Sequence, residues 1–272
     1  MQYNGSTEVY GIMGNPVTHS MSPAMHNAAF AALGLNKIYV PFPVENVSQA
    51  MSGFRALHVK GVSVTIPHKQ AVIQYLDSID PVAAKIGAVN TLVLDDRRRI
   101  HGLNTDWIGA NRALGEVLAL NGEKVLLLGA GGSARAIGFG LLEAGARIVL
   151  ASRTPAKGRA LAEILGCEWQ PIADVPALAA DILINATSVG MTPAEQNSPV
   201  PAAALRNFPV VMDIVYAPLE TRLLSEARAA GCSVVNGLVM LLYQGVAQFE
   251  TWTGREAPID LMRQSLLAHL NR

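Results

Sequence analysis

Residues 124–153 read KVLLLGAGGSARAIGFGLLEAGARIVLASR, and this stretch decides the fold class of the chain. The short, unbroken apolar run at residues 125–128 is typical of a strand that is buried on both faces of a parallel sheet. A helix is expected to begin near Ser133, after a glycine-rich turn, and residues 147–151 (RIVLA) supply a second strand. The stretch therefore predicts one βαβ unit, in which a helix joins two parallel strands.

The glycine-rich turn fits the dinucleotide-binding pattern G-x-G-x-x-G/A at Gly129, Gly131 and Ala134. Gly129 permits a tight turn, Gly131 lets the backbone approach a pyrophosphate, and the small Ala134 lets the helix pack against the strand. The free N–H groups and the positive dipole end of the helix would then bind the pyrophosphate. A glycine turn alone is weak evidence, because such turns also simply end strands, and it is the βαβ context that makes the pattern specific.

The end of the second strand indicates which coenzyme the unit binds. Ser152 stands where an NAD enzyme would carry a ribose-binding Asp or Glu, and Arg153 follows it. A carboxylate would repel a 2′-phosphate, whereas an arginine offers a planar fork of donors to it. Lys157 and Arg159 lie just beyond. The sequence therefore predicts NADP rather than NAD, although these cations would also fit an ordinary solvated helix start.

The composition indicates a globular protein with a small-molecule partner. The 272 residues are enough for two domains, and a content of 50% hydrophobic and 15% charged residues excludes a disordered chain. The formal net charge is zero, with 21 acidic and 21 basic residues, so there is no electrostatic reason to expect nucleic acid.

The sequence shows neither a targeting signal nor a metal motif. The start MQYNGSTEVYG has no basic residue and no apolar core, and no uncharged apolar run approaches the ~18 residues of a membrane span. We therefore expect a cytoplasmic protein. Cys167 and Cys232 have no paired spacing and are expected to be free thiols. The six histidines form no ligand pattern, so no metal is expected.

The first part of the chain predicts a second α/β region, with strands at residues 8–13, 37–44 and 62–66, helices at 22–34 and 47–57, and a hairpin of 90–94 with 99–102. Ser22 is expected to cap the helix that Pro23 begins. Ser20 has no such structural duty. Hydroxyl groups at these two positions, between a strand and a helix, can face a polyhydroxylated ligand.

Two charged residues stand at element ends in this region. Lys69 follows the third strand at its carboxyl end, where open α/β sheets bind ligands, but an exposed lysine in a first helical turn fits equally well. Asp106 opens a helix that is expected to run toward Leu120, and it could be no more than the cap of that helix.

The region after residue 122 repeats the βα pattern. We expect three further strands at residues 181–186, 210–215 and 233–235, a weak candidate strand near Cys167, and helices at 155–165 and 219–230. Together with the βαβ unit they complete a six-stranded doubly wound sheet. Polar turns at 185–191 (NATSVGM) and 213–218 (DIVYAP) follow two of the strands on the coenzyme side. Residues 237–251 and 259–270 are expected to be helices that pack back on the first domain, with Gln244 and Gln248 one turn apart.

Eight segments in the same order make the whole chain resemble the shikimate dehydrogenase family. They are GNPVTHSMSPAMHN at 14–27, SVTIPHK at 63–69, GAVNT at 87–91, NTDWIG at 104–109, GAGGSAR at 129–135, NATSVGM at 185–191, DIVYAPLET at 213–221 and NGLVMLLYQG at 236–245. The resemblance implies NADP-dependent, reversible reduction of 3-dehydroshikimate to shikimate, in the pathway to chorismate and the aromatic amino acids.

The resemblance also implies a fold and a set of site residues. The fold is α/β with two domains: residues 1–105 bind the substrate, with 241–272 packed on them, and residues 106–240 form a Rossmann-type doubly wound parallel sheet for NADP. Lys69 and Asp106 would be the catalytic pair. The substrate would contact Ser20, Ser22, Thr65, Asn90, Asp106, Tyr216 and Gln244. The coenzyme would contact Gly129, Ala130, Gly131, Gly132, Ser133, Ala134, Arg135, Ser152, Arg153, Thr154, Lys157, Thr187, Ser188, Ile214 and Gly237.

Two positions depart from the family pattern, and two other functions stay open. Ser152 stands where the family usually has Asn, and Lys157 where Arg is common; both departures bear on the strength of the NADP preference. A related quinate or aminoshikimate dehydrogenase, with either NAD or NADP as its coenzyme, is the nearest alternative. A non-catalytic NADPH sensor would need only the glycine turn and Arg153, and would give no reason for Lys69 and Asp106. The resemblance leaves open whether the protein is a monomer or a homodimer.

Overall fold

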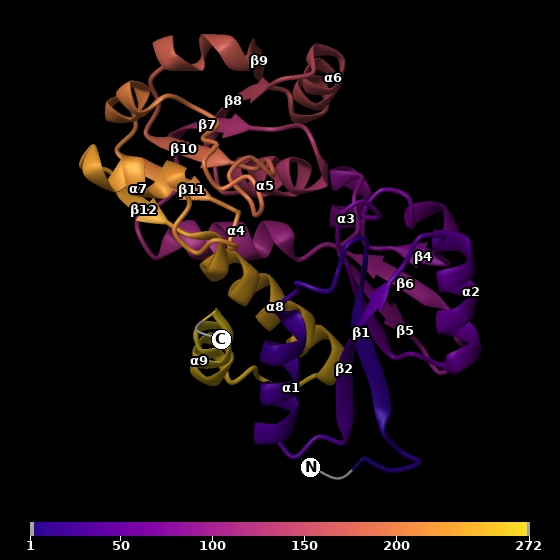
Figure 1. Cartoon of the computed structure of the whole chain (residues 1–272). Coiled ribbons are helices and arrows are strands. Elements are labelled where there is room, and N and C mark those ends of the chain that lie inside the picture. Colours follow the sequence, from indigo (N-terminus) through magenta and orange to yellow (C-terminus); the bar gives the residue numbers. More distant parts are fainter. Residues whose placement is uncertain (1–2, 271–272) are drawn as a thin grey trace. The chain divides into compact units, whose positions relative to one another are not determined.

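A computed structural model describes residues 3–270 and divides them into two compact units (Figure 1). The first unit holds the residues up to Thr105 and those from Gln244 onward, and the second unit is Asp106–Tyr243. Helix α8 (Gly237–Thr253) begins in the second unit and continues into the first.

The first unit is built on a mixed six-stranded sheet in the order β2-β1-β3-β5-β6-β4. Its strands are β1 (Glu8–Gly14), β2 (Lys37–Pro43), β3 (Gly61–Val64), β4 (Ser78–Ile79), β5 (Thr91–Leu94) and β6 (Ile100–Leu103). β1 pairs in parallel with β2 and β3, whereas β5 pairs antiparallel with both of its neighbours. The carboxyl ends of β1 and β3 therefore lie at one edge, where the loops carrying Ser20 and Lys69 begin.

Two different cores cover the faces of this sheet. Met51 and Phe54 of α2 (Val47–Leu57) pack with strand residues in an aliphatic core, together with η1 (Ile73–Tyr75) and α3 (Pro81–Ile86). On the alternate strand positions, Tyr10 and Tyr39 face a cluster of aromatic rings contributed by α1 (Ser22–Ala32) and α8. α9 (Ile259–Leu270) packs beside α1 (Figure 1).

The second unit is a six-stranded sheet in which every pairing is parallel, in the order β12-β11-β10-β7-β8-β9. Its strands are β7 (Lys124–Leu128), β8 (Arg147–Ser152), β9 (Glu168–Pro171), β10 (Ile182–Asn185), β11 (Val210–Asp213) and β12 (Ser233–Val235). This is the order of a dinucleotide-binding doubly wound sheet, and its direction of winding reverses between β7 and β10, where such sheets bind ligands.

Helices cover both faces of the second sheet, which explains why its inner strands are apolar without alternation. One core includes residues of α4, α5 and α6, and the other includes residues of α7 and of the two 3₁₀ segments. The bounds are α4 (Asp106–Gly115), α5 (Gly132–Glu143), α6 (Pro155–Leu165), η2 (Ile172–Ala177), η3 (Ala202–Asn207) and α7 (Arg222–Ala229).

The structure confirms the predicted fold class, adds the unpredicted elements η1, β4, α3, η2 and η3, and corrects several element ends. The helix expected to reach Leu120 ends at Gly115. α7 begins at Arg222, because Thr221 caps it by accepting a hydrogen bond from the Leu224 N–H. α1 has Met21 at its N-cap, so the prediction that Ser22 caps this helix is wrong; Ser22 is its first residue.

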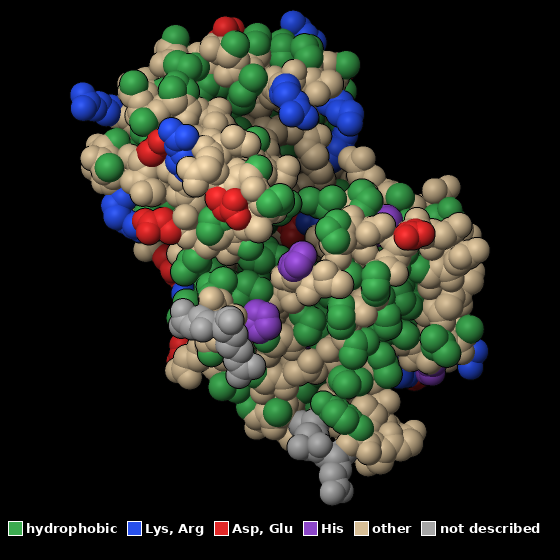
Figure 2. Space-filling model, viewed as in Figure 1, with side chains coloured by type: hydrophobic (Ala, Val, Ile, Leu, Met, Phe, Trp, Pro, Cys, Tyr) green, Lys and Arg blue, Asp and Glu red, His purple; other side chains and the backbone are tan. Residues whose placement is uncertain are grey.

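The surface agrees with the balanced charge. Lys and Arg side chains are spread among Asp and Glu over the face drawn in Figure 2, without one dominant basic patch. Within residues 3–270, no helix is both long and apolar enough to span a membrane.

Candidate active site

The glycine turn after β7 has the geometry that the motif predicts. Gly129 has φ +118°, a conformation that L-residues with side chains rarely adopt, and an added Cβ would lie 2.8 Å from the Ala186 carbonyl oxygen. The Gly129 N–H donates to the Ala151 carbonyl at 2.8 Å, which ties the turn to the end of β8. Ala134 is fully buried. Gly129 is therefore held where only glycine fits.

The start of α5 fits an anionic coenzyme. Gly131 is its N-cap, no side chain in the described part of the chain caps the helix, and a Cβ at this position would meet open space. The backbone N–H groups at the helix start are thus open to an anion. The buried Nε of Arg135, one turn into the helix, has no hydrogen-bond partner within residues 3–270. These features fit the pyrophosphate that the motif predicts.

The end of β8 separates a buried Ser152 from exposed cations. The Ser152 hydroxyl accepts a hydrogen bond from the Trp169 indole N–H at 3.0 Å and donates to the Thr154 carbonyl at 3.3 Å. Gly158 permits this packing, because a Cβ there would collide with both side chains. The Ser152 side chain therefore has a structural role, because both of these hydrogen bonds stabilise the turn after β8.

The basic residues beside Ser152 divide into two kinds. Arg153, Thr154 and Lys157 are exposed at the end of β8 and the start of α6. Arg159 is also exposed, but its guanidinium lies 4.3 Å from the centre of the Trp169 ring. Of the three cations in the sequence pattern, Arg153 and Lys157 are therefore the ones suited to a 2′-phosphate.

A buried carboxylate joins the two polar turns of the coenzyme unit. The Asn185 amide donates to Asp213 at 2.9 Å, and Asp213 also accepts from the Thr221 hydroxyl at 2.7 Å and the Val215 N–H at 3.0 Å. The other end of the Asn185 amide accepts from the Thr187 hydroxyl at 2.6 Å. These bonds fix the turn that carries Thr187 and Ser188 relative to the turn that carries Ile214.

Burial raises the pKa of Asp213 to about 6, although its three hydrogen bonds oppose the shift. Asn185, Asp213 and Thr221 are fully buried and were not predicted as site residues. The signal that could have identified them is a polar residue at the last position of an otherwise apolar strand, as at 185 and 213.

Ile214 and Gly237, both predicted to contact the coenzyme, lie together. A Cβ on Gly237 would collide with the carbonyl group of Ile214, so the start of α8 can approach this turn only with glycine. Tyr216 lies in the same turn, and burial raises the pKa of its hydroxyl.

In the first unit, two of the predicted substrate hydroxyls lie close together, Ser20 on the loop between β1 and α1 and Ser22 at the start of α1. Ser20 Oγ accepts a hydrogen bond from the Ser22 N–H at 3.3 Å, so Ser20 has a structural duty, contrary to the prediction. The Ser22 side chain is buried and does not cap the helix. Gly14, at the end of β1, makes room for Thr65, because a Cβ on it would collide with the Thr65 methyl group.

Lys69 lies on the loop that follows β3. The Thr65 N–H donates to the Met13 carbonyl at 2.9 Å, and the buried His68 ring lies 2.8 Å from the Val44 carbonyl oxygen. The Lys69 carbonyl accepts from the Val89 N–H at 2.8 Å. The loop is thus anchored at three points, and the half-buried Lys69 side chain stands on a fixed backbone.

Asn90 and Thr105 hold the predicted substrate loop and the approach to Asp106 together. The Asn90 amide oxygen accepts from the Thr105 N–H at 2.7 Å, and its amide nitrogen donates to the Thr105 hydroxyl at 3.0 Å. Asn104 donates to the Ala88 carbonyl at 2.8 Å. Asp106 is buried and is the first residue of α4 and of the second unit, whereas Lys69 belongs to the first unit.

Gln244 and Gln248 lie one turn apart on α8, and both side chains are buried. Gln248 hydrogen-bonds to residues of β3 and β5, as described below. The sequence pattern placed it on the same face as Gln244 but gave it no role.

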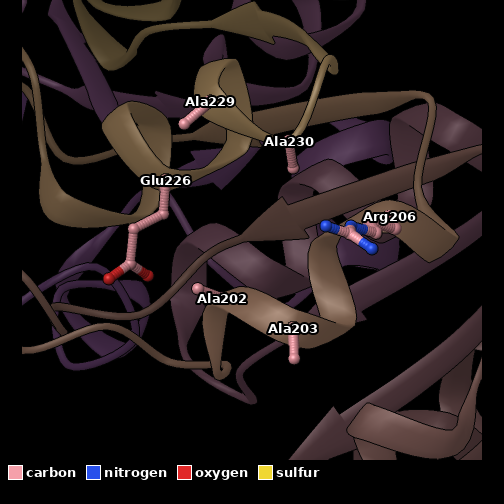
Figure 3. Close-up of a pocket in the computed structure, with 6 residues that line it drawn as sticks. All are labelled: Ala202, Ala203, Arg206, Glu226, Ala229 and Ala230. Carbon is pink, nitrogen blue, oxygen red and sulfur yellow. The ribbon is translucent and has the colours of Figure 1, made fainter.

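A shallow depression of about 380 Å³ lies between η3 and α7 and contains none of the predicted site residues. Four alanines line it, and Arg206 and Glu226 lie on opposite sides of it (Figure 3). Because it lacks converging polar groups, it is a surface feature without evident chemistry. Within residues 3–270, no three metal-ligating side chains come together.

Comparison with known proteins matches most of the chain. Residues 12–92 match the shikimate dehydrogenase substrate binding domain, residues 110–216 match shikimate / quinate 5-dehydrogenase, and residues 237–267 match the shikimate 5′-dehydrogenase C-terminal domain. The NADP(+) shikimate dehydrogenase of Methanothermobacter thermautotrophicus is 51% identical over 98% of this chain and 99% of its own.

Solved structures agree with this match. A crystal structure of shikimate dehydrogenase in complex with NADP⁺ has a TM-score of 0.94 and 41% identity, and covers 100% of this chain and 98% of its own. The Thermus thermophilus enzyme in complex with NADP(H) and shikimate has a TM-score of 0.87 and 38% identity, covering 96% of this chain and 99% of its own. The chain belongs to the shikimate dehydrogenase family.

Proposed function

We propose that the protein is an NADP-dependent shikimate dehydrogenase, which reversibly reduces 3-dehydroshikimate to shikimate. The observation that carries this proposal is the end of β8, where a buried Ser152 replaces the acid of NAD enzymes and Arg153 follows it exposed. A relative that is 51% identical and named for NADP(+)-dependent shikimate dehydrogenation supports the same substrate.

The proposed division of labour follows the two units. The first unit, which the residues from Gln244 onward complete, binds the substrate, and the second unit, Asp106–Tyr243, binds NADP. In the coenzyme region, the open N-terminus of α5 and the buried Arg135 Nε hold the pyrophosphate. Arg153 and Lys157 hold the 2′-phosphate, and the turns that carry Thr187 and Ile214 line the rest of the site.

The proposed chemistry assigns proton handling to Lys69 and Asp106. NADPH supplies a hydride to the ketone carbon, and the ketone oxygen gains a proton as it becomes a hydroxyl. The Lys69 ammonium donates a hydrogen bond to that oxygen and favours its developing negative charge. Asp106 accepts a hydrogen bond from a neighbouring substrate hydroxyl. The lysine–aspartate pair thus orients the ring and exchanges the proton.

The substrate is a polyhydroxylated carboxylic acid, and the residues proposed to contact it match that chemistry. Ser20, Ser22, Thr65 and Tyr216 offer hydroxyl groups, and Asn90 and Gln244 offer amides that both donate and accept. Most of these side chains are buried or half-buried, and the loops of Thr65 and Asn90 are tied to the sheet by backbone hydrogen bonds. Such fixed groups discriminate between patterns of hydroxyl groups.

Quinate is the second candidate substrate. A quinate dehydrogenase from Corynebacterium glutamicum in complex with NAD has a TM-score of 0.88 and 31% identity to this chain. The small hydroxyl side chains of Ser20 and Ser22 favour shikimate over quinate. Arg153, with no acidic residue beside it, favours NADP over NAD. We propose that the enzyme acts in the cytoplasm, on a dissolved metabolite.

The test is to incubate the purified protein with 3-dehydroshikimate and NADPH and to identify the product by chromatography against authentic shikimate. We expect shikimate to form in proportion to the NADPH oxidised. No NADPH oxidation, or oxidation without shikimate, would refute the proposal.

A further inference from the structure

A chain of buried hydrogen bonds crosses the first unit through Gln248. The Tyr39 hydroxyl donates to Ser63 Oγ at 2.6 Å, and Ser63 donates to the Gln248 amide oxygen at 2.7 Å. The Gln248 amide nitrogen donates to the Thr91 hydroxyl at 3.0 Å and to the Asn90 carbonyl at 3.2 Å. The side chain of α8 thus joins β3 to β5.

The donor and the acceptor are fixed where Gln248 meets Thr91. Because the Gln248 N–H₂ group can only donate, the Thr91 hydroxyl accepts from it and turns its own proton elsewhere. The shorter contact open to that proton is the Asn90 amide oxygen at 2.7 Å, whereas the Thr105 hydroxyl lies at 3.4 Å. The Thr105 N–H also donates to the Asn90 amide oxygen. Two donors therefore converge on one end of the Asn90 amide and fix which end presents oxygen and which presents nitrogen.

Gln248 also fixes the helix that carries Gln244. The two residues are one turn apart on α8, and Gln248 is fully buried. Gly245 lies between them, and a Cβ on it would collide with Met25 of α1, so the helix packs closely at this turn. The bonds from Gln248 to β5 therefore set the position of the Gln244 turn relative to Asn90.

We propose that Gln248 is a positioning residue for the substrate, which holds the Asn90 amide in one orientation and fixes α8 at the turn of Gln244. It acts through Thr91 and Asn90 and does not itself contact the substrate. This inference rests on the proposed function, since Asn90 and Gln244 are its proposed substrate contacts.

A residue that served only the core would affect stability and leave substrate affinity alone. Gln248 differs because two of its bonds end at Asn90 and Thr91. The effect of its loss should therefore appear in the KM for shikimate, separately from stability.

The experiment compares Gln248→Met with Ser63→Ala in the full-length enzyme. Methionine keeps the volume of glutamine and removes its polar groups, whereas Ser63→Ala breaks the same chain on the side away from Asn90. For Gln248→Met we expect the shikimate KM to rise roughly tenfold, the scale of one hydrogen bond, with the NADP⁺ KM unchanged. For Ser63→Ala we expect a smaller change in the shikimate KM.

Thr91→Val breaks the next link and covers the case in which Gln248→Met does not fold. It should raise the shikimate KM to a similar extent, and the double variant should be little worse than either single variant. The inference is overturned if Gln248→Met and Thr91→Val lower only thermal stability, or if they raise both KM values equally.

Asn90→Ala separates failure of this inference from failure of the proposed function. If Asn90→Ala raises the shikimate KM and Gln248→Met does not, the positioning role is wrong and the substrate site stands. If Asn90→Ala leaves the shikimate KM unchanged, the proposed contact itself is wrong, and the positioning role falls with it.

Discussion

The two units bury their ionisable groups in opposite ways. In the first unit, His26 is fully buried among aromatic rings, and burial lowers its pKa although the Gln248 side chain opposes the shift. In the second unit, Asp213 ends a strand and accepts three hydrogen bonds that join two loops. The aromatic core therefore keeps the imidazole of His26 neutral, whereas in the coenzyme sheet the carboxylate of Asp213 connects two loops through hydrogen bonds.

The comparison concerns groups that stabilise the structure within each unit, whereas Lys69 is the residue that we propose acts on the substrate. We expect Lys69→Ala to lower kcat by roughly 10²-fold or more, the scale of a general acid or base, with a much smaller change in the shikimate KM. Steady-state kinetics measure both. Lys60→Ala is the control, because Lys60 pairs with the exposed Asp96. Near-wild-type turnover of Lys69→Ala would remove Lys69 from the mechanism.

The pH dependence of the free energy of unfolding tests the role of His26 in the first unit. Burial lowers its pKa to about 3, so between pH 6.5 and pH 3 the unfolded chain binds a proton that the folded chain does not. Its contribution to the free energy of unfolding should therefore fall by about 2 kcal/mol between pH 7 and pH 5.

Urea unfolding of His26→Phe at the two pH values, followed by the fluorescence of the neighbouring Trp252, measures this contribution. The variant should lose less stability on acidification than the wild type. His19→Gln, at an exposed position, should behave as the wild type does. An unchanged pH slope in His26→Phe would show that the buried imidazole is not the group that titrates.

Arg153 tests the coenzyme side of the comparison. We expect Arg153→Ala to raise the NADP⁺ KM roughly tenfold and to leave the NAD⁺ KM unchanged, because only NADP⁺ carries the 2′-phosphate. Arg159→Ala should change the NADP⁺ KM less, since its guanidinium lies on Trp169. Equal effects of the two variants would mean that the 2′-phosphate is bound diffusely by the basic helix start.

Asp213 tests the second unit. Its contribution to the free energy of unfolding should change with pH in the opposite direction to that of His26. Its folded pKa of about 6 is above the ordinary value, so it favours the folded state below pH 4 and loses that contribution as pH rises through 6. On acidification from pH 7 to pH 5, the contribution of Asp213 to the free energy of unfolding should rise by about 1 kcal/mol. Asp213→Asn should flatten this part of the unfolding profile, whereas Asp174→Asn, at an exposed position, should not. A profile that is unchanged in Asp213→Asn would contradict the assignment.

Local patterns predicted the second unit most completely. Its inner strands are apolar runs, its glycine turn is contiguous, and the six-stranded parallel sheet follows from repetition of one βα pattern. In the first unit, most strands and helices were predicted, but η1, β4, α3 and the N-cap of α1 were not. The pattern Ser-Pro suggested Ser22, while the backbone places Met21 there.

The buried hydrogen bonds of Asp213 and Gln248 could not be predicted, because the residues that they join are distant in sequence. Asn185 and Asp213 are 28 residues apart, and Gln248 and Thr91 are 157 residues apart. Nor could the sequence indicate that Trp169 bonds to Ser152, since β9 was only a weak candidate strand. Such contacts depend on which strands become neighbours, and a polar residue in an apolar run shows only that it needs some partner.

The central claim is that the coenzyme unit selects NADP and the substrate unit selects shikimate. The most direct measurement is the initial rate of NADP⁺ and NAD⁺ reduction by the wild-type protein, with shikimate and with quinate, under identical conditions. We predict fast turnover with shikimate and NADP⁺ and slow turnover in the other three combinations. Comparable rates with quinate or with NAD⁺ would contradict the claim, and no turnover in any combination would contradict the enzymatic function itself.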